Sequence, residues 1–100
     1  MPDQDGYPTA VELDRIRMWP IDDPRGWLGF IQSCWHMADW GWHTGETRDA
    51  NSVWTLHHVS TGGWSGNESI IHHAELNRAL WMQVWQSTRR GGHYEFLVPA

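Results

Sequence analysis

The longest regular pattern of apolar and polar positions lies in the second half of the chain. Between Glu68 and Arg90, apolar residues recur at intervals of three and four, which places them on one side of a helical wheel. Arg89 and Arg90 occupy the last turn, where cations complement the helix dipole, and two glycines follow as a stop signal. The pattern predicts one long helix whose apolar face comprises Ile70, Ile71, Ala74, Leu80, Trp81, Val84 and Trp85.

A glycine-rich loop with the sequence TGGWSGNE, residues 61–68, leads into this helix. Ser65 and Glu68 have the spacing of a capping box, in which the hydroxyl accepts a hydrogen bond from the first turn and the carboxylate reaches back to the cap. Asn67 is an alternative cap. The helix is therefore expected to begin immediately after the glycines.

Alternation with a period of two marks the candidate strands. Residues 39–59 form two alternating runs separated by the turn-rich segment ETRDANS, which predicts a β-hairpin. Residues 93–98 alternate and are closed by Pro99, which predicts a final strand paired with the hairpin. Val11 and Leu13 also fit the period of a strand, and we expect one there that ends at Pro20.

A second helix is predicted before the hairpin. Asp23 is placed to cap it and Pro24 to occupy its first position. Gly26 and Gly29 oppose a helix, each costing about 1 kcal/mol relative to alanine. The apolar positions that recur at three and four are Trp27, Ile31, Cys34, Trp35 and Ala38.

These elements predict a small α+β domain over residues 10–100, preceded by a flexible polar arm over residues 1–9. Its antiparallel sheet of three or four strands is expected to pack against the one long helix. A chain of 100 residues makes one domain, and its nine tryptophans can supply the core, since each aromatic side chain buries about 150–250 Å².

Composition narrows the expected surroundings of the protein. The single cysteine permits no internal disulfide. No apolar stretch approaches the roughly 18 residues of a membrane helix, and the acidic start differs from a secretory signal, so we expect a soluble protein in the host cytoplasm without a membrane partner.

The charges favour some partners over others. The net charge is −5, with seven arginines and no lysine, so a row of phosphate contacts to duplex DNA is not expected. The first fifty residues carry that negative charge, which would suit a basic groove on another protein. Residues 51–100 carry three acids, three arginines and five of the seven histidines, and are the better place for an anionic ligand.

Two polar residues interrupt the apolar face of the predicted helix. His73 and Asn77 lie on that face, and Arg78 lies at its edge. Because burying an unpaired imidazole or amide costs several kcal/mol, either neighbouring groups satisfy both side chains or the helix lines a pocket. In the second interpretation, all three residues point into a cleft walled by tryptophans.

The glycine loop is a candidate anion site. Glycines let backbone approach a ligand closely, and a helix N-terminus offers unpaired N–H groups. Trp64 is either part of the core or a surface on which a base stacks, while Arg89 and Arg90 are suited to bidentate contact with phosphate. The alternative is a tight capped turn and a solvated helix end. The loop residues assigned to the ligand are Thr61, Gly62, Gly63, Trp64, Ser65, Gly66 and Asn67.

The sequence assigns no catalytic residue, metal ligand or cofactor. His57 and His58 point to opposite faces of a strand, and His72 and His73 lie about 100° apart on a helix, so neither pair chelates a metal by itself. A mixed site of His73, a strand histidine and a carboxylate remains an alternative. Cys34 with His36, or Ser65 with a distant histidine, would be the nucleophile pairs, and the apolar surroundings of Cys34 favour an inert core thiol.

Two sequence blocks carry a family resemblance. With TGGWSGNE at residues 61–68 and RRGGHY at residues 89–94, the chain resembles a family of small bacteriophage and prophage proteins over residues 54–98. The resemblance implies a phage source and no particular reaction. It also marks both blocks as the family's shared positions.

Taken together, these features favour a non-catalytic phage-type binding protein. It would sequester an anionic small molecule, such as a nucleotide signal of host defence, in a tryptophan-lined site. One alternative is an inhibitor that binds a host protein through exposed tryptophan and acidic surface, and another is a small histidine- or metal-dependent hydrolase. A homo-oligomer is compatible with each of these.

Overall fold

The structure, a computed structural model, describes residues 7–48 and 51–99. It confirms an α+β fold with one four-stranded antiparallel sheet in the order β1-β2-β4-β3. Residues 1–6 of the expected arm lie outside the described residues. In chain order the elements are α1 (Ala10–Arg17), α2 (Pro24–Cys34), α3 (Ala38–Gly41), β1 (Trp42–Arg48), β2 (Val53–Ser60), α4 (Ser65–Leu76), α5 (Arg78–Val84), β3 (Trp85–Arg89) and β4 (His93–Pro99).

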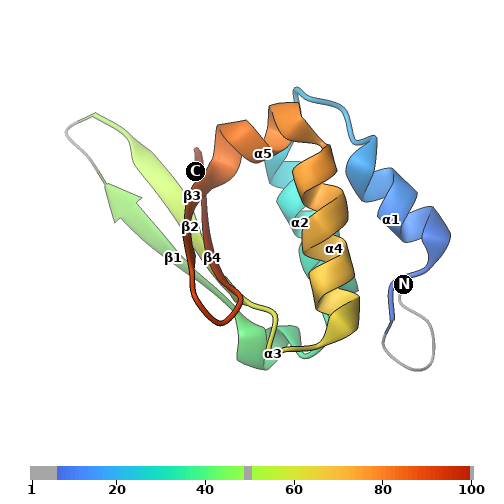
Figure 1. Ribbon diagram of the computed structural model, residues 1–100. Helices are drawn as coiled ribbons and strands as arrows, with labels where there is room; N and C mark the ends of the chain where they lie inside the picture. Colours follow the sequence, from blue (N-terminus) through green and yellow to red (C-terminus); the bar gives the residue numbers. More distant parts are fainter. Residues whose placement is uncertain (1–6, 49–50, 100) are drawn as a thin grey trace.

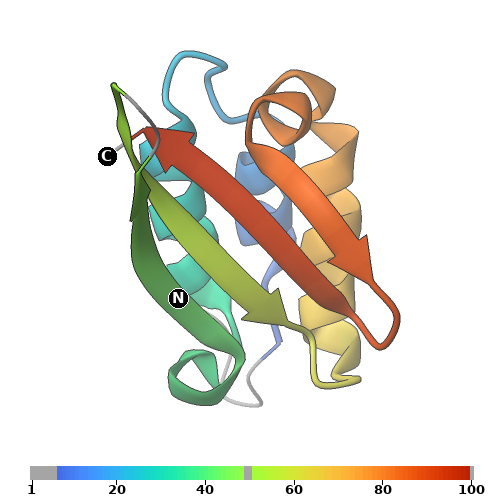
Figure 2. The same cartoon turned by 90° about the vertical axis from the view of Figure 1, so that its left-hand side faces the viewer.

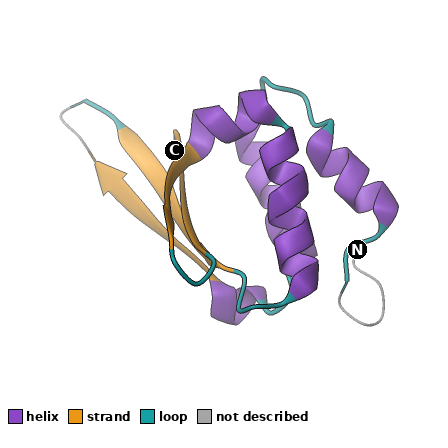
Figure 3. Cartoon of the chain, in the orientation of Figure 1, coloured by secondary structure: helices purple, strands orange, loops and turns teal. Residues whose placement is uncertain are grey.

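The elements form layers on one side of the sheet. Helices α2, α4 and α5 cover one sheet face, and α1 packs outside them against α4 and α2 (Figure 1). Figure 3 shows the same division between helices and strands. In the part of the chain that the structure describes, no helix lies over the opposite face, which is turned to the viewer in Figure 2.

We call this uncovered side the open face. Its residues alternate with the buried ones of the covered face, among which are His57, Val59, Phe96 and Val98. Cross-strand neighbours share a face, so the register defines the members of the open face. They are His43, Gly45 and Thr47 on β1, Trp54, Leu56, His58 and Ser60 on β2, Ser87 and Arg89 on β3, and His93, Glu95, Leu97 and Pro99 on β4.

The core lies between the sheet and the helices. Trp27 is fully buried there, and its indole N–H donates to the carbonyl of Ile16 at 2.9 Å, which ties α2 to α1. Trp42 is also buried, edge-on to Trp35. The other buried apolar residues of the cluster are Ile16, Leu28, Ile31, Cys34, Val59, Ile70, Ile71, Ala74, Leu80, Val84, Phe96 and Val98.

Several sequence predictions are confirmed. Strands β1 and β2 form the expected hairpin, and β4 pairs with β2 as the expected final strand. Helix α2 begins as predicted, because the Asp23 carboxylate accepts from the N–H of Gly26 at 3.1 Å and Pro24 takes the first position. The N-terminal part of the first alternating run differs, since residues 38–41 form the short helix α3.

The single helix predicted over residues 68–90 is wrong in extent. Helix α4 ends at Leu76, and α5 follows after Asn77, whose backbone is non-helical at φ −84° and ψ 74°. The Asn77 amide donates to the carbonyls of Ile16 and Trp19, both at 3.2 Å, and these tertiary hydrogen bonds hold the break. The helical periodicity then gives way to β3 at Trp85, which pairs with β4.

The strand predicted from Val11 onward is also wrong, because this segment forms α1. Thr9 accepts from the N–H of Glu12, and the Glu12 carboxylate accepts from the N–H of Thr9, which completes a capping box. Ile16, which interrupted the strand pattern, is buried in the core. The capping signal outweighs the short alternation of Val11 and Leu13.

Candidate functional site

The two sequence blocks TGGWSGNE and RRGGHY meet at one end of the sheet. The loop after β2 and the turn between β3 and β4 lie at the same end in Figure 2. The N–H of Thr61 donates to the carbonyl of Gly92 at 3.0 Å. Gly92 has a φ of +79°, and a Cβ there would collide with the Thr61 hydroxyl, so only glycine fits this contact. Because β3 runs back along the sheet, Arg89 lies at this junction rather than at the far end of a long helix.

A polar row crosses the open face near this junction. The register aligns His43, His58, Glu95 and Ser87, one residue from each strand. Within the row, His58 Nδ1 lies 3.3 Å from Glu95 Oε2, and the Ser87 hydroxyl donates to Glu95 Oε1. The Ser87 hydrogen bond, with the charges of His58 and Arg89, lowers the pKa of Glu95, so this carboxyl is ionised at neutral pH.

The next row is closer to the turn and contains Ser60, His93 and Arg89. Ser60 Oγ and His93 Nδ1 form a hydrogen bond of 2.7 Å. Arg89 is exposed beside His93, and among the described residues no carboxylate lies within ion-pair distance of its guanidinium.

His58 and Glu95 of the first row and all three residues of the second line a cavity of about 350 Å³ over β2, β4 and the end of β3. We call it the sheet-face site, and its side chains are those of His58, Ser60, Arg89, His93 and Glu95. An unpaired guanidinium beside a hydroxyl and an imidazole is suited to bind an anion.

The glycine loop has a different environment. Trp64, not Ser65, is the N-cap of α4, and it makes no side-chain cap; Ser65 donates instead to the Tyr7 hydroxyl. The predicted capping box of Ser65 and Glu68 is therefore absent from this helix start. Trp64 packs against the imidazole of His36, with ring centroids 4.4 Å apart, and against the ring of Tyr7 at 4.8 Å. A ligand that stacks on Trp64 would have to compete with these contacts.

Other loop residues hold the turn in place. Asn67 is buried, and its amide bonds both the N–H and the carbonyl of His36, at 2.9 and 3.1 Å. Gly66 lies so close to the Trp64 indole that a Cβ would stand 2.8 Å from Nε1. Gly62 and Gly63 take positive φ values of 64° and 74°. The cavity beside this loop measures about 130 Å³ and is lined by His36, Met37, Trp40, Thr61, Gly62, Trp64 and Asn67.

The remaining predicted site residues are not brought together. His73 bonds the carbonyl of Ser69 in its own helix at 2.9 Å, and Asn77 is buried in the contact with α1. Arg78 lines a separate cavity with His72 and Trp81, among others, on α4 and α5. Arg90 is exposed in the turn before β4. Of the predicted site residues, only the loop start and Arg89 therefore lie beside one another.

Sequence reasoning missed His58, Ser60, His93 and Glu95 as one constellation. The alternation of the two strands already places His58 and Ser60 on one face, and His93 and Glu95 on one face. What the sequence lacks is the register, which sets Ser60 opposite His93 and His58 opposite Glu95.

Two other titratable groups belong to the core. His57 is buried, and its Nδ1 accepts the indole N–H of Trp42 at 3.0 Å, while burial lowers its pKa. Burial also raises the pKa of the Cys34 thiol to about 11, and this thiol donates to the Glu12 carboxylate. Neither group is arranged as a nucleophile or base. No group of three or more histidine, cysteine or acidic side chains is placed to hold a metal ion within the described ranges.

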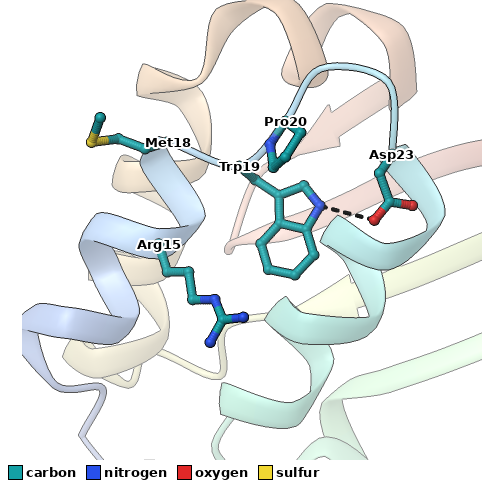
Figure 4. A pocket seen from close by; sticks show the side chains of 5 residues that line it. All are labelled: Arg15, Met18, Trp19, Pro20 and Asp23. Carbon is teal, nitrogen blue, oxygen red and sulfur yellow. Dashed lines mark hydrogen bonds between the residues drawn. The ribbon is translucent and has the colours of Figure 1, made fainter.

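A further cavity, of about 280 Å³, lies between α1 and α2 (Figure 4). The Arg15 guanidinium lies over the rings of Trp19 and Phe30, 5.6 and 5.1 Å from their centroids. The Trp19 indole N–H donates to Asp23 at 3.2 Å, which fixes the ring on the cap of α2. Met18 and Pro20 complete the wall, and Met18 is 70% exposed.

Comparison with protein-family models, curated proteins and solved structures gives no match to this chain. Within residues 7–48 and 51–99, no helix has the length and apolar character needed to cross a membrane.

Proposed function

We propose that this protein binds a small anionic molecule at the sheet-face site and does not transform it. The observation that carries the proposal is the Arg89 guanidinium, unpaired within the described residues, which shares a cavity with Ser60 and His93. A guanidinium offers five N–H donors in a planar fork that matches phosphate and carboxylate oxygens. Ser60 and His93 bond each other, and whichever of the two accepts in this bond retains a donor for the anion.

Binding is favoured over hydrolysis by the hydrogen bonds of the site. The 2.7 Å contact of Ser60 and His93 has the length expected of a nucleophile and its base. In such an arrangement a third group orients the base, and Glu95 is the nearest carboxylate in the register. Its two oxygens, however, accept from Ser87 and pair with His58. Among the described residues, Glu95 makes no hydrogen bond or ion pair with His93, so the Ser60–His93 pair lacks it as an orienting acid.

The phage resemblance supports a sequestering role. The TGGWSGNE block ends β2 at the site, and the RRGGHY block supplies both Arg89 and His93. A protein of 100 residues that binds an anionic signal without turnover would act by removing it from solution. We therefore propose that a nucleotide signal of host defence is the biological ligand and that the protein counters this defence.

The test is a calorimetric titration with inorganic phosphate and with nucleoside phosphates, on the original chain and on Arg89→Gln. Losing a charge-assisted hydrogen bond should weaken binding by about tenfold or more. Arg78→Gln is the matched control, because it changes the net charge equally in a separate cavity. Absence of binding, or an equal loss in both variants, would contradict the proposal.

A second candidate, docking on a host protein, is favoured by the cavity between α1 and α2. Arg15 is held on two aromatic rings, and Met18, which lines the same cavity, is 70% exposed. Exposed arginine and large apolar side chains are frequent anchors of protein interfaces. A partner captured from host lysate by the original chain and lost with Met18→Asp would support docking, whereas capture unaffected by that change would oppose this surface.

A further inference from the structure

We infer that the ligand of the sheet-face site is a nucleoside phosphate that lies along β2 and β4. Its phosphate would contact Arg89, and its base would lie over Leu56 and Leu97, with its far edge toward Trp54. This inference rests on the proposed function and deepens it by naming the order of chemical groups in the ligand.

The open face continues beyond the cavity as an apolar area. The register sets Leu56 opposite Leu97 on β4 and opposite Gly45 on β1, and Trp54 opposite Thr47. Leu56, Leu97 and Trp54 are partly exposed, whereas their inward-facing neighbours such as Phe96 and Val98 are buried.

Glycine at position 45 keeps this area open. A Cβ added to Gly45 would meet no atom within 4 Å, so no side chain covers the sheet beside Leu56. A flat ring can therefore approach Leu56 and Leu97 from the solvent side. Trp54 adds an aromatic surface, and stacking of a base on such a ring is sequence-tolerant.

Along β2 and β4, the open face changes in a fixed order from cationic through polar to apolar. The row of Arg89, His93 and Ser60 lies nearest the turn between β3 and β4. The row of His58 and Glu95 comes next, and the apolar area around Leu56 and Leu97 follows. From Ser60 to Leu56 is four residues, or about 13 Å at the rise of a strand. A nucleoside phosphate has the same order of groups, with an anion, a hydroxylated sugar and an apolar-faced base.

The polar row suits a sugar better than a hydrocarbon. A carboxylate offers about four lone-pair positions, and the bonds to Ser87 and His58 use two of those of Glu95. The others remain to accept from sugar hydroxyls. The methylene chain of a fatty acid would have to cover an ionised carboxylate at this point, which is costly without a partner. Inorganic phosphate would use the Arg89 row alone.

The experiment compares three probes by calorimetry: inorganic phosphate, ribose 5-phosphate and adenosine 5′-monophosphate. The nucleotide should bind about tenfold to a hundredfold more tightly than ribose 5-phosphate, the range expected for one stacked base. Leu97→Ala and Trp54→Ala should each reduce this advantage while leaving the affinity for inorganic phosphate unchanged. Leu76→Ala, at an exposed apolar position on α4, is the control and should change neither.

The outcomes separate the two proposals. If the phosphorylated probes bind in an Arg89-dependent way with equal affinity, the site is an anion site and the nucleoside inference is overturned. If none of the three probes binds, both the proposed anion-binding function and the nucleoside inference are overturned. The indole N–H resonance of Trp54 provides a second readout that does not depend on the folding of a variant. It should shift with the nucleotide and not with inorganic phosphate, and no shift with the nucleotide would overturn the inference.

Discussion

His57 and His58 are neighbours in β2, and the sheet separates them into two different environments. His57 lies on the covered face, where burial lowers its pKa and its Nδ1 accepts the Trp42 indole N–H. His58 lies on the open face, exposed and paired with Glu95 at the edge of the sheet-face site. The covered face therefore maintains the fold, whereas the open face leaves its polar side chains accessible to solvent.

The largest expected effect compares Phe96 with Leu97, adjacent residues on opposite faces of β4. Phe96 is 2% exposed, so Phe96→Ala should lower the free energy of unfolding by about 3–5 kcal/mol. Leu97 is only partly buried, and Leu97→Ala should cost about 1 kcal/mol or less. Urea unfolding measures both, and similar losses would break the division between the faces.

A smaller effect is expected from the hydrogen bond between Trp42 and His57. Trp42→Phe keeps an aromatic ring in the core but leaves His57 Nδ1 without its donor at 3.0 Å. An unsatisfied buried acceptor costs about 1–3 kcal/mol. The same denaturation experiment should show this loss, and an unchanged stability would indicate that the bond contributes nothing.

The pH dependence of stability should also distinguish the two histidines. Because the folded protein holds the pKa of His57 below its ordinary 6.5, the unfolded chain takes up this proton more readily. The stability associated with neutral His57 is therefore complete above pH 6.5 and is lost as the pH falls below that value. His57→Gln should remove this loss and His58→Gln should retain it. Thermal unfolding across this range tests the assignment, which the opposite pattern would refute.

Glu95 affects the stability of the fold at a lower pH than His57 does. Its pKa is lowered in the folded state, so its contribution is present above the ordinary value of 4.5 and lost as the pH falls through the folded-state pKa. Glu95→Gln should therefore flatten the stability profile only below pH 4.5. A change near neutral pH instead would show that Glu95 is not the group responsible.

The smallest effect is expected for His58→Gln at neutral pH. His58 is 54% exposed, and pairs between exposed charges contribute little to stability. The midpoint of urea unfolding should stay within experimental error of the original chain. A loss comparable to that of Trp42→Phe would place His58 among the residues that hold the fold.

Local patterns predicted the parts of the fold whose stability is local. The alternation in β2 and β4 and the Asp23 cap of α2 depend on near neighbours, and both were predictable. The break at Asn77 was not, because its amide bonds the carbonyls of Ile16 and Trp19, some sixty residues away in sequence. Helical periodicity continues through this point and gives no sign of the tertiary partners.

The candidate site was predictable to a similar degree. The Arg89–Arg90 pair was predicted as an anion contact at a helix end, and the structure places Arg89 on a strand instead. Its neighbours Ser60 and His93 come together only through the register of β2 and β4, which no local pattern specifies. Trp64, which its position in the glycine loop made a ligand candidate, packs against His36 and Tyr7.

The most direct test of the open face as the ligand site is a two-dimensional amide NMR titration with adenosine 5′-monophosphate. We expect the largest shifts on the open face, at Leu56, His58, Ser60, Arg89, His93 and Leu97, with the glycine loop near Trp64 little affected. Shifts centred on Gly62 and Trp64, or no shifts at saturating nucleotide, would contradict it.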